Sequence, residues 1–397
     1  MKYLILQPDG VADRRIPALD DRTPLEYART PHMDCLATHG LLGMTHTIPP
    51  GLSPGSDVGT MSVLGYDPRL YHTGRSPIEA ASMGVDLGPD DVAFRCNLVT
   101  LEAGVMVDFT AGHISTGEAA AILRDLSREL GGGDVELYPG VSYRHLLVWR
   151  HGKSAMHTTP PHDITGRAAA EFLPSGEAAD VLLRLMETSQ GVLAQHPVNQ
   201  TRRERGERPA TSIWLWGQGK RPALPTLRER FGISGAVISA VDLVNGLGVL
   251  AGLERIRVPG ATGFLDTNYR GKAEYALRAL REKDIVFVHV EATDEAGHMG
   301  AVDKKVQAIE DFDAQVVGTL LDGLCEGGDW RMLLMPDHAT PCAEMTHTPD
   351  PVPFVVVSAQ DLKTPRGPRG YNEPAAEAAG VVVEHAHGLL PAYLLKA

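Results

Sequence analysis

Residues 285–298 read IVFVHVEATDEAGH, an apolar run from Ile285 to Val290 that is followed by Asp294 and His298. A short, continuous apolar run that ends in polar residues is typical of a strand buried on both faces. Asp294 and His298 are four residues apart, so on a helical turn they share one face. The stretch therefore predicts a buried parallel strand with a carboxylate and an imidazole just beyond its end.

Apolar runs of the same kind recur along the chain, and amphipathic segments lie between them. The runs cover residues 3–6, 236–239, 332–335 and 354–357. Residues 272–282 and 304–324 repeat apolar side chains close to the 3.6-residue period of a helix. Strands that alternate with helices predict an α/β fold, with a doubly wound and mostly parallel sheet.

The middle of the chain has shorter and more broken segments. Here we expect strands at 92–99 and 145–149, helices at 116–130 and 178–188, and loops at 131–133 and 202–208. A chain of 397 residues exceeds what one small core needs. We therefore predict a discontinuous core domain of residues 1–75 and 210–397, interrupted by a smaller α/β cap domain of residues 76–209.

Composition narrows the class of protein. The chain has 37 Lys and Arg against 50 Asp and Glu, a net charge of −13, which argues against a nucleic-acid-binding face. No apolar run approaches the roughly 20 residues of a membrane span. The N-terminal apolar stretch is too short for a secretory signal, so we expect a cytoplasmic protein. Cys35, Cys96, Cys325 and Cys342 are scattered, which disfavours disulfides and a thiolate zinc site.

Other candidate ligands follow strand ends in the same way as Asp294. Asp9 follows the first apolar run, Asp337 and His338 follow the run at 332–335, and His347 lies shortly beyond. In doubly wound sheets, ligands bind beyond the carboxyl ends of the strands. Taken singly, each Asp–His combination is more often a helix cap or a surface pair. Together they predict a centre for two divalent ions. Carboxylate with imidazole favours Mn²⁺ first, and Zn²⁺ or Mg²⁺ are the alternatives, although Mg²⁺ prefers oxygen ligands.

Ser56 lies in the sequence Pro54-Gly55-Ser56-Asp57. Gly55 and Gly59 allow a tight turn, and a helix that begins here would place Ser56 at its N-terminus, where anions are favoured. A nearby metal would activate the serine hydroxyl without a histidine base. The alternative is that Ser56 is an ordinary N-cap.

Six segments resemble a known family: QPDG at 7–10, PGSD at 54–57, LGYDP at 64–68, DEAGH at 294–298, PDH at 336–338 and HTPDPVPF at 347–354. They are similar to the cofactor-independent phosphoglycerate mutases, specifically the archaeal-type branch, within the alkaline phosphatase superfamily. The resemblance covers essentially the whole chain.

The resemblance implies a role for each matching residue. One metal would be held by Asp294, His298 and His347, and the other by Asp9, Ser56, Asp337 and His338. Ser56 would take the phosphoryl group from 3-phosphoglycerate and return it to the 2-hydroxyl of the same glycerate. A cap domain would keep the glycerate in place while it turns.

The substrate on this view is a small phosphorylated metabolite, which needs cationic contacts besides the metals. Residues in matching motifs that we expect to face the substrate are Arg75, Arg95, His162, Asp163 and Arg167. Solvent exposure is the alternative for each arginine. The sequence leaves the oligomeric state open.

Two stretches depart from the family pattern. Phe109, Thr110, His113 and Trp216 stand where the resemblance leads us to expect arginines. A homoserine kinase or another small-molecule phosphotransferase therefore stays open. The resemblance to the superfamily also leaves open a hydrolase of phosphate or phosphonate esters. The chain has no G-x-x-x-x-G-K-[ST] loop for ATP, which counts weakly against a kinase.

Overall fold

The computed structural model describes residues 1–324, 328–367 and 369–395, so Cys325 lies outside the described residues. The chain divides into two compact units, Met1–His72 with Ala223–Ala397, and Thr73–Pro222. The second boundary falls later in the chain than the expected 209/210. The reason is that strand β9 (Ser212–Lys220) pairs with β3 (Val92–Glu102) and so belongs to the inserted unit.

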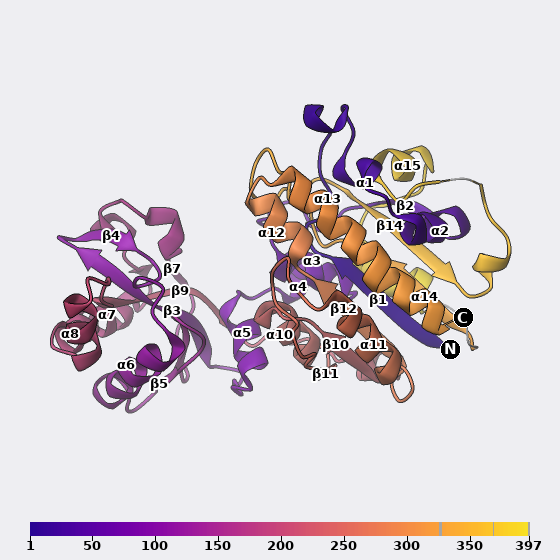
Figure 1. The fold of residues 1–397 in the computed structure, drawn as a ribbon. Coiled ribbons are helices and arrows are strands. Elements are labelled where there is room, and N and C mark those ends of the chain that lie inside the picture. Colours follow the sequence, from indigo (N-terminus) through magenta and orange to yellow (C-terminus); the bar gives the residue numbers. More distant parts are fainter. Residues whose placement is uncertain (325–327, 368, 396–397) are drawn as a thin grey trace. The chain divides into compact units, whose positions relative to one another are not determined.

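The first unit is built on an eight-stranded sheet (Figure 1). Its strand order is β11 (Glu254–Arg255), β10 (Gly235–Ile238), β12 (Ile285–Val290), β1 (Lys2–Pro8), β13 (Trp330–Leu334), β14 (Val352–Ser358), β2 (Leu41–Thr45) and β15 (Val382–Val383). All neighbouring pairs are parallel except those that β14 makes with β13 and β2. The prediction of a mostly parallel doubly wound sheet is confirmed.

The expectation that residues 354–357 form a parallel strand is wrong. An apolar run reports burial and does not report direction. Parallel neighbours need a crossover connection, usually a helix, whereas antiparallel neighbours need only a turn or loop. The chain between β13 and β14 forms no helix, and β14 therefore returns antiparallel to β13.

Helices cover both faces of this sheet, which is why its inner strands are apolar throughout. On one face, the core joins Ala236 and Ile238 of β10 to α2 (Pro31–His39), α11 (Tyr269–Ala279), α13 (Val302–Asp311) and the π-helical turn Phe312–Val317. That turn continues into α14 (Gly318–Leu324), which packs beside α11 (Figure 1). The expected helices at 272–282 and 304–324 are thus confirmed.

The other face of the sheet carries α10 (Asp242–Leu250), which packs closely against Val237 of β10 and also contacts α3 (Ser56–Val63). Val237 points to the opposite face from Ala236 and Ile238, because successive side chains of a strand alternate. Helix α3 therefore lies on this second face. No helix among the described residues is both long and apolar enough to cross a membrane.

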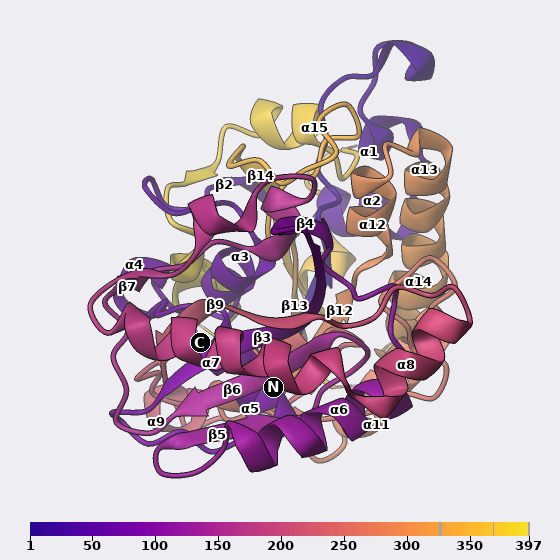
Figure 2. The ribbon, with the colours of Figure 1, turned by 90° about the vertical axis from the view of Figure 1, so that its left-hand side faces the viewer.

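The inserted unit has its own antiparallel sheet and core. The strand order is β4 (Val105–Asp108), β3, β6 (Arg144–Trp149) and β5 (Val135–Tyr138), with β9 also paired to β3. Figures 1 and 2 show α6 (Thr116–Glu129) and α7 (Ala179–Ala194) on one side of this sheet and α5 (Ser76–Met83) on the other. The strands and helices expected here are confirmed.

The expected loop at 202–208 is wrong at its start, because α8 (Pro197–Glu204) includes Arg202. The Arg202 side chain is buried, where it pairs with Glu118 and donates to the carbonyl oxygens of Ala111 and Gly112. The remaining α-helices and strands among the described residues are α1 (Pro24–Tyr27), α4 (Pro68–Tyr71), α9 (Leu227–Phe231), α12 (Ala292–His298), α15 (Glu373–Ala378), β7 (Met156–His157) and β8 (Ser175–Gly176).

Candidate active site

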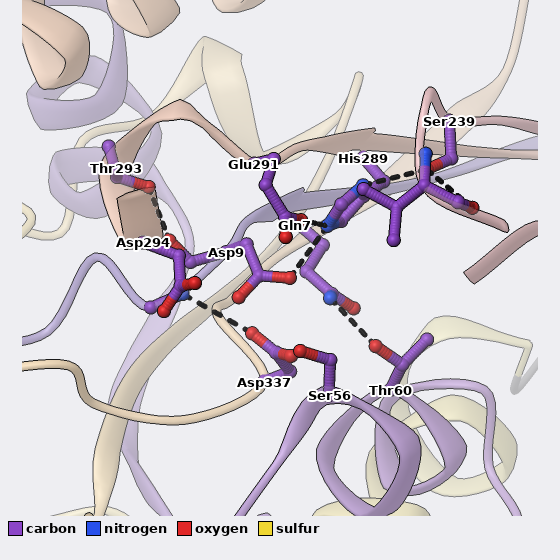
Figure 3. A network of polar contacts seen from close by, with 12 residues as sticks. Gln7, Asp9, Ser56, Thr60, Ser239, His289, Glu291, Thr293, Asp294 and Asp337 are labelled. Carbon is purple, nitrogen blue, oxygen red and sulfur yellow. Dashed lines mark hydrogen bonds and ion pairs between the residues drawn. The ribbon is translucent and has the colours of Figure 1, made fainter. Parts of the chain in front are cut away.

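The three central strands of the large sheet end in the predicted ligands. Strand β1 leads into Asp9, β12 into α12 with Asp294 and His298, and β13 into Asp337 and His338. Because β12, β1 and β13 are adjacent and parallel, their carboxyl ends meet at one edge of the sheet. Figure 3 shows Asp9, Asp294 and Asp337 lying together at this edge, with Ser56 beside Asp337.

Asp294, His298 and His347 form one cluster. The Nε2 atom of His298 lies 2.9 Å from Nε2 of His347 and 3.1 Å from Oδ2 of Asp294. The Nε2 atom of His347 lies 3.4 Å from Oδ1 of Asp294. The other nitrogen of His298, Nδ1, is 3.0 Å from the carbonyl oxygen of Met345, which orients the ring.

Asp9, Asp337 and His338 form a second cluster, and Ser56 joins it. The Nε2 atom of His338 lies 3.4 Å from Oδ1 of Asp9, 3.3 Å from Oδ2 of Asp337 and 3.3 Å from Oγ of Ser56. Nδ1 of His338 lies 3.2 Å from the hydroxyl of Thr340, which also donates to Oδ1 of Asp294. Thr340 therefore links the two clusters.

Ser56 is the first residue of α3, and the N-cap is Gly55. The N-cap alternative for Ser56 is therefore wrong, and its hydroxyl is turned toward His338 instead. Gly55 has an extended backbone with φ of 173°, which any residue can adopt, so the backbone conformation at this position does not itself require glycine.

Two glycines allow the backbone segments of the site to approach closely. A Cβ on Gly59 would lie 2.2 Å from the carbonyl oxygen of Asp337, so α3 can pack against that loop only with glycine here. Gly10 has φ of +55°, and a Cβ there would lie 2.5 Å from Oδ1 of Asp294.

Electrostatics at the site favour bound cations. Burial, followed by the charges of Asp337, Glu291 and Asp294, raises the pKa of the Asp9 carboxyl well above its ordinary value. Burial also raises the pKa of Asp337 to about 6 and lowers the pKa of His338 to about 3. Buried like charges of this kind are costly without compensation.

The carboxylate and imidazole ligands of the two clusters, and the unpaired carboxylate oxygens among them, fit divalent ions. Oδ1 of Asp9 and Oδ2 of Asp337 are buried and have no hydrogen-bond partner among the described residues. Each of the two clusters brings its ligand atoms within 4.8 Å of one another and can hold a metal ion. Mixed carboxylate and imidazole donors suit Mn²⁺ or Zn²⁺.

Several residues at the site were not found from the sequence. His289 and Glu291 form a third group with Asp9. The feature of the sequence that could have indicated this group is His289, a histidine inside an otherwise apolar strand. Lys272 of α11 is also part of these surroundings, because its side chain is fully buried and Nζ donates to the carbonyl oxygen of His289, at 2.9 Å.

In the inserted unit, four of the five expected substrate contacts lie near one another. Glu79 bridges two of them, 3.3 Å from Nε of Arg75 and 3.2 Å from Nε of Arg95. The charges of Arg95 and Arg75 act on His162, which lies 3.6 Å from Asp163. Burial, opposed by Asp163 and reinforced by these arginines, lowers the pKa of His162.

Arg167 differs from these four, because its guanidinium packs over the ring of Phe172. The aromatic residues that replace expected arginines have structural partners. Trp216 is stacked under Arg95, and Phe109 contacts the ring of His162. Thr110 and His113 sit in the turn after β4, where the Thr110 hydroxyl donates to Asp108 and accepts from the His113 amide.

A mostly parallel α/β sheet that gathers carboxylates and imidazoles at its strand ends, with a serine beside them, defines a class of protein able to hold divalent metals next to a serine hydroxyl. A family model described as 2,3-bisphosphoglycerate-independent phosphoglycerate mutase matches residues 37–199. The probable enzyme of that description from Geobacter sulfurreducens is 52% identical over 394 residues, 98% of each chain. The enzyme from Methanosarcina acetivorans is 50% identical over 95% of each chain.

Solved structures agree with these relatives. A protein from Pyrococcus horikoshii superposes with a TM-score of 0.82 at 30% identity, covering 98% of this chain and 95% of the other. The cofactor-independent phosphoglycerate mutase from Thermoplasma acidophilum gives 0.68 at 28% identity, covering 98% of both. The chain belongs to the 2,3-bisphosphoglycerate-independent phosphoglycerate mutase family, a family of isomerases.

Proposed function

We propose that the protein interconverts 3-phosphoglycerate and 2-phosphoglycerate through a phosphorylated Ser56. The observation that carries the proposal is the position of Ser56 at the start of α3, 3.3 Å from His338, which forms a cluster with Asp9 and Asp337. Relatives of near-complete coverage are named for this reaction, which supports the assignment.

In the first half-reaction, the bond between Ser56 Oγ and phosphorus forms as the bond from phosphorus to O3 of the glycerate breaks. Ser56 gives up its hydroxyl proton, and O3 takes up a proton. In the second half, the bond between O2 of the same glycerate and phosphorus forms as the bond from phosphorus to Ser56 Oγ breaks; O2 gives up its proton, and Ser56 takes up a proton. The phosphoserine stores the group, so no free bisphosphoglycerate is needed.

We assign one metal to Asp294, His298 and His347, and the other to Asp9, Ser56, Asp337 and His338. Mn²⁺ is the ion we favour, since it accepts both carboxylate and imidazole donors. When bound, such a pair of ions lowers the pKa of a coordinated hydroxyl and neutralises charge on the transferring phosphoryl group. The chain's own contribution is to hold Ser56 Oγ at the start of α3, beside His338.

Coupling the protein to enolase tests this function, because 2-phosphoglycerate then appears as phosphoenolpyruvate. We expect turnover with Mn²⁺ and little release of inorganic phosphate. Rapid phosphate release would favour an ester hydrolase. ATP-dependent phosphorylation of homoserine, without mutase turnover, would favour a kinase. Substitution of Arg75, Arg95, His162, Asp163 and Arg167 would test their proposed substrate contacts.

Removal of divalent metals should abolish activity and lower thermal stability. Asp9, Asp294 and Asp337 are buried together, so their mutual repulsion reappears when the compensating charge is lost. We expect incubation with EDTA, followed by buffer exchange, to lower the melting temperature and abolish turnover in the enolase-coupled assay. Added Mn²⁺ should restore both. A melting temperature that does not respond to EDTA or Mn²⁺ would contradict the metal assignment.

Asp337→Asn should weaken metal binding more than it weakens folding. The amide keeps the shape of the side chain but removes a charge from Oδ2, which has no hydrogen-bond partner among the described residues. Outer-shell partners contribute about 10–100-fold to metal affinity, and a direct ligand should contribute at least as much. Titration of the chelated protein with Mn²⁺ measures the effect. An Asp337→Asn protein that binds two ions as tightly as wild type would remove Asp337 from the ligand set.

A further inference from the structure

His289 is fully buried inside β12 and is in contact through both ring nitrogens (Figure 3). Its Nε2 atom lies 2.7 Å from Oδ2 of Asp9 and 3.2 Å from Oε2 of Glu291. Its Nδ1 atom lies 2.9 Å from the hydroxyl of Ser239. These contacts fix the plane of the ring directly behind Asp9.

The contacts of Ser239 are the basis on which we assign the ring proton of His289. Its oxygen already accepts the amide hydrogen of Val241 at 3.0 Å, whereas the carbonyl oxygen of Val241 is 3.5 Å away, too far for a strong bond. The hydroxyl hydrogen is therefore directed to Nδ1 of His289. A neutral imidazole that accepts at Nδ1 carries its proton on Nε2, which then donates to Asp9.

Because of this hydrogen bond, the two oxygens of the Asp9 carboxylate have different contacts. Oδ2 accepts from His289, and the hydroxyl of Thr293 holds the backbone oxygen of the same residue. Oδ1 lies 3.4 Å from Nε2 of His338 and has no hydrogen-bond partner among the described residues. Oδ1 is therefore the oxygen presented to the cluster of Asp337 and His338.

A third cation between Asp9, His289 and Glu291 is the alternative, since their ligand atoms lie within 4.8 Å of one another. Two arguments disfavour it. The proton assigned to Nε2 would occupy the lone pair that a metal needs. The buried ammonium of Lys272, 2.9 Å from the carbonyl oxygen of His289, also interacts electrostatically with Glu291 and already supplies a positive charge there.

We propose that His289 is a positioning residue that holds Asp9 by Oδ2 so that Oδ1 faces the metal. The inference rests on the proposed function in one respect, because it takes Asp9 as a metal ligand. Hydrogen bonds behind a metal ligand fix its orientation and raise metal affinity. Ser239 acts one step further back by fixing the tautomer of His289.

Two substitutions, His289→Asn and His289→Gln, distinguish a hydrogen bond that orients Asp9 from a side chain that only fills the space behind it. An asparagine amide reaches only the position of Nδ1, whereas a glutamine amide can place a donor where Nε2 stood. Electron paramagnetic resonance of free Mn²⁺ gives binding isotherms for the full-length chelated protein. We expect wild type to bind two ions, and His289→Asn to lose about 10–100-fold in affinity for one of them. His289→Gln should restore most of that loss.

His145→Asn is a matched control, because His145 is a buried histidine of the inserted unit whose Nδ1 accepts from the amide of Gly140. It should leave both Mn²⁺ affinities unchanged. Ser239→Ala provides a second test if His289→Asn does not fold. It keeps the His289 ring and should weaken the same ion, by less than His289→Asn does.

Two results would overturn the proposal. One is unchanged Mn²⁺ affinity in Ser239→Ala and in every folded His289 variant. The other is a third Mn²⁺ in wild type that the His289 variants lose, which would assign a cation site instead. Failure of the proposed function gives a different pattern: the binding results hold, but the enolase-coupled assay stays silent with wild-type protein and Mn²⁺.

Discussion

Ser56→Ala should abolish mutase turnover while leaving the fold and the metal content nearly intact. The hydroxyl is the only group that Ser56 contributes to the second cluster, and the four-residue set proposed for that metal retains Asp9, Asp337 and His338 without it. Loss of a covalent nucleophile lowers turnover by about 10⁴-fold or more. The enolase-coupled assay and metal analysis of the purified variant measure the two effects.

Ser62→Ala is a matched control on the same helix. Ser62 is buried and donates to the carbonyl oxygen of Thr47 at 2.6 Å, away from the clusters. Its loss should cost about 1 kcal/mol of stability and leave turnover close to wild type. If Ser56→Ala lost metal together with activity, Ser56 would be a structural residue. Retained turnover in Ser56→Ala would exclude the phosphoserine mechanism.

Gly59→Ala should damage both stability and catalysis, although glycine to alanine in a helix is normally favourable. The new methyl group would lie 2.2 Å from the carbonyl oxygen of Asp337 and 2.8 Å from its Cβ. Helix α3 and the Asp337 loop must then separate, which moves Ser56 away from its neighbours. Overpacking of this kind costs about 1–3 kcal/mol. Chemical denaturation and the coupled assay should both show the loss.

Gly191→Ala supplies the comparison, because Gly191 lies within α7 and nothing lies within 4 Å of a Cβ placed there. In this variant the helical preference of alanine acts alone, and stability should rise by roughly 0.5–1 kcal/mol without change in turnover. A Gly59→Ala protein that is as stable and active as Gly191→Ala would show that α3 does not need its close contact with the Asp337 loop.

Much of the candidate site could be placed from the sequence because its residues follow strand ends. Asp9, Asp294 and Asp337 come just after short apolar runs, and parallel strands put their carboxyl ends at one edge. That rule predicts proximity without knowledge of any contact. The start of a helix at Ser56 could be placed from a different, local pattern, the glycine and polar residues around it.

Other features could not be predicted because they depend on partners far away in the chain. The direction of β14 follows from its pairing with β13 and β2, which its own apolar side chains do not encode. The membership of β9 in the inserted unit likewise follows from its pairing with β3. The burial of Lys272 depends on the strand under α11, since the helix's own pattern is compatible with a solvated lysine.

The amino-acid sequence by itself determined the alternation of strands and helices, and with it the edge of the sheet where carboxylates and imidazoles collect. These are consequences of local periodicity and of the geometry of parallel strands. Only the tertiary structure decided that Gly59 serves a contact with Asp337 and that His289 stands behind Asp9. Such contacts join residues 278 and 280 positions apart, and no local pattern specifies which distant atoms will meet.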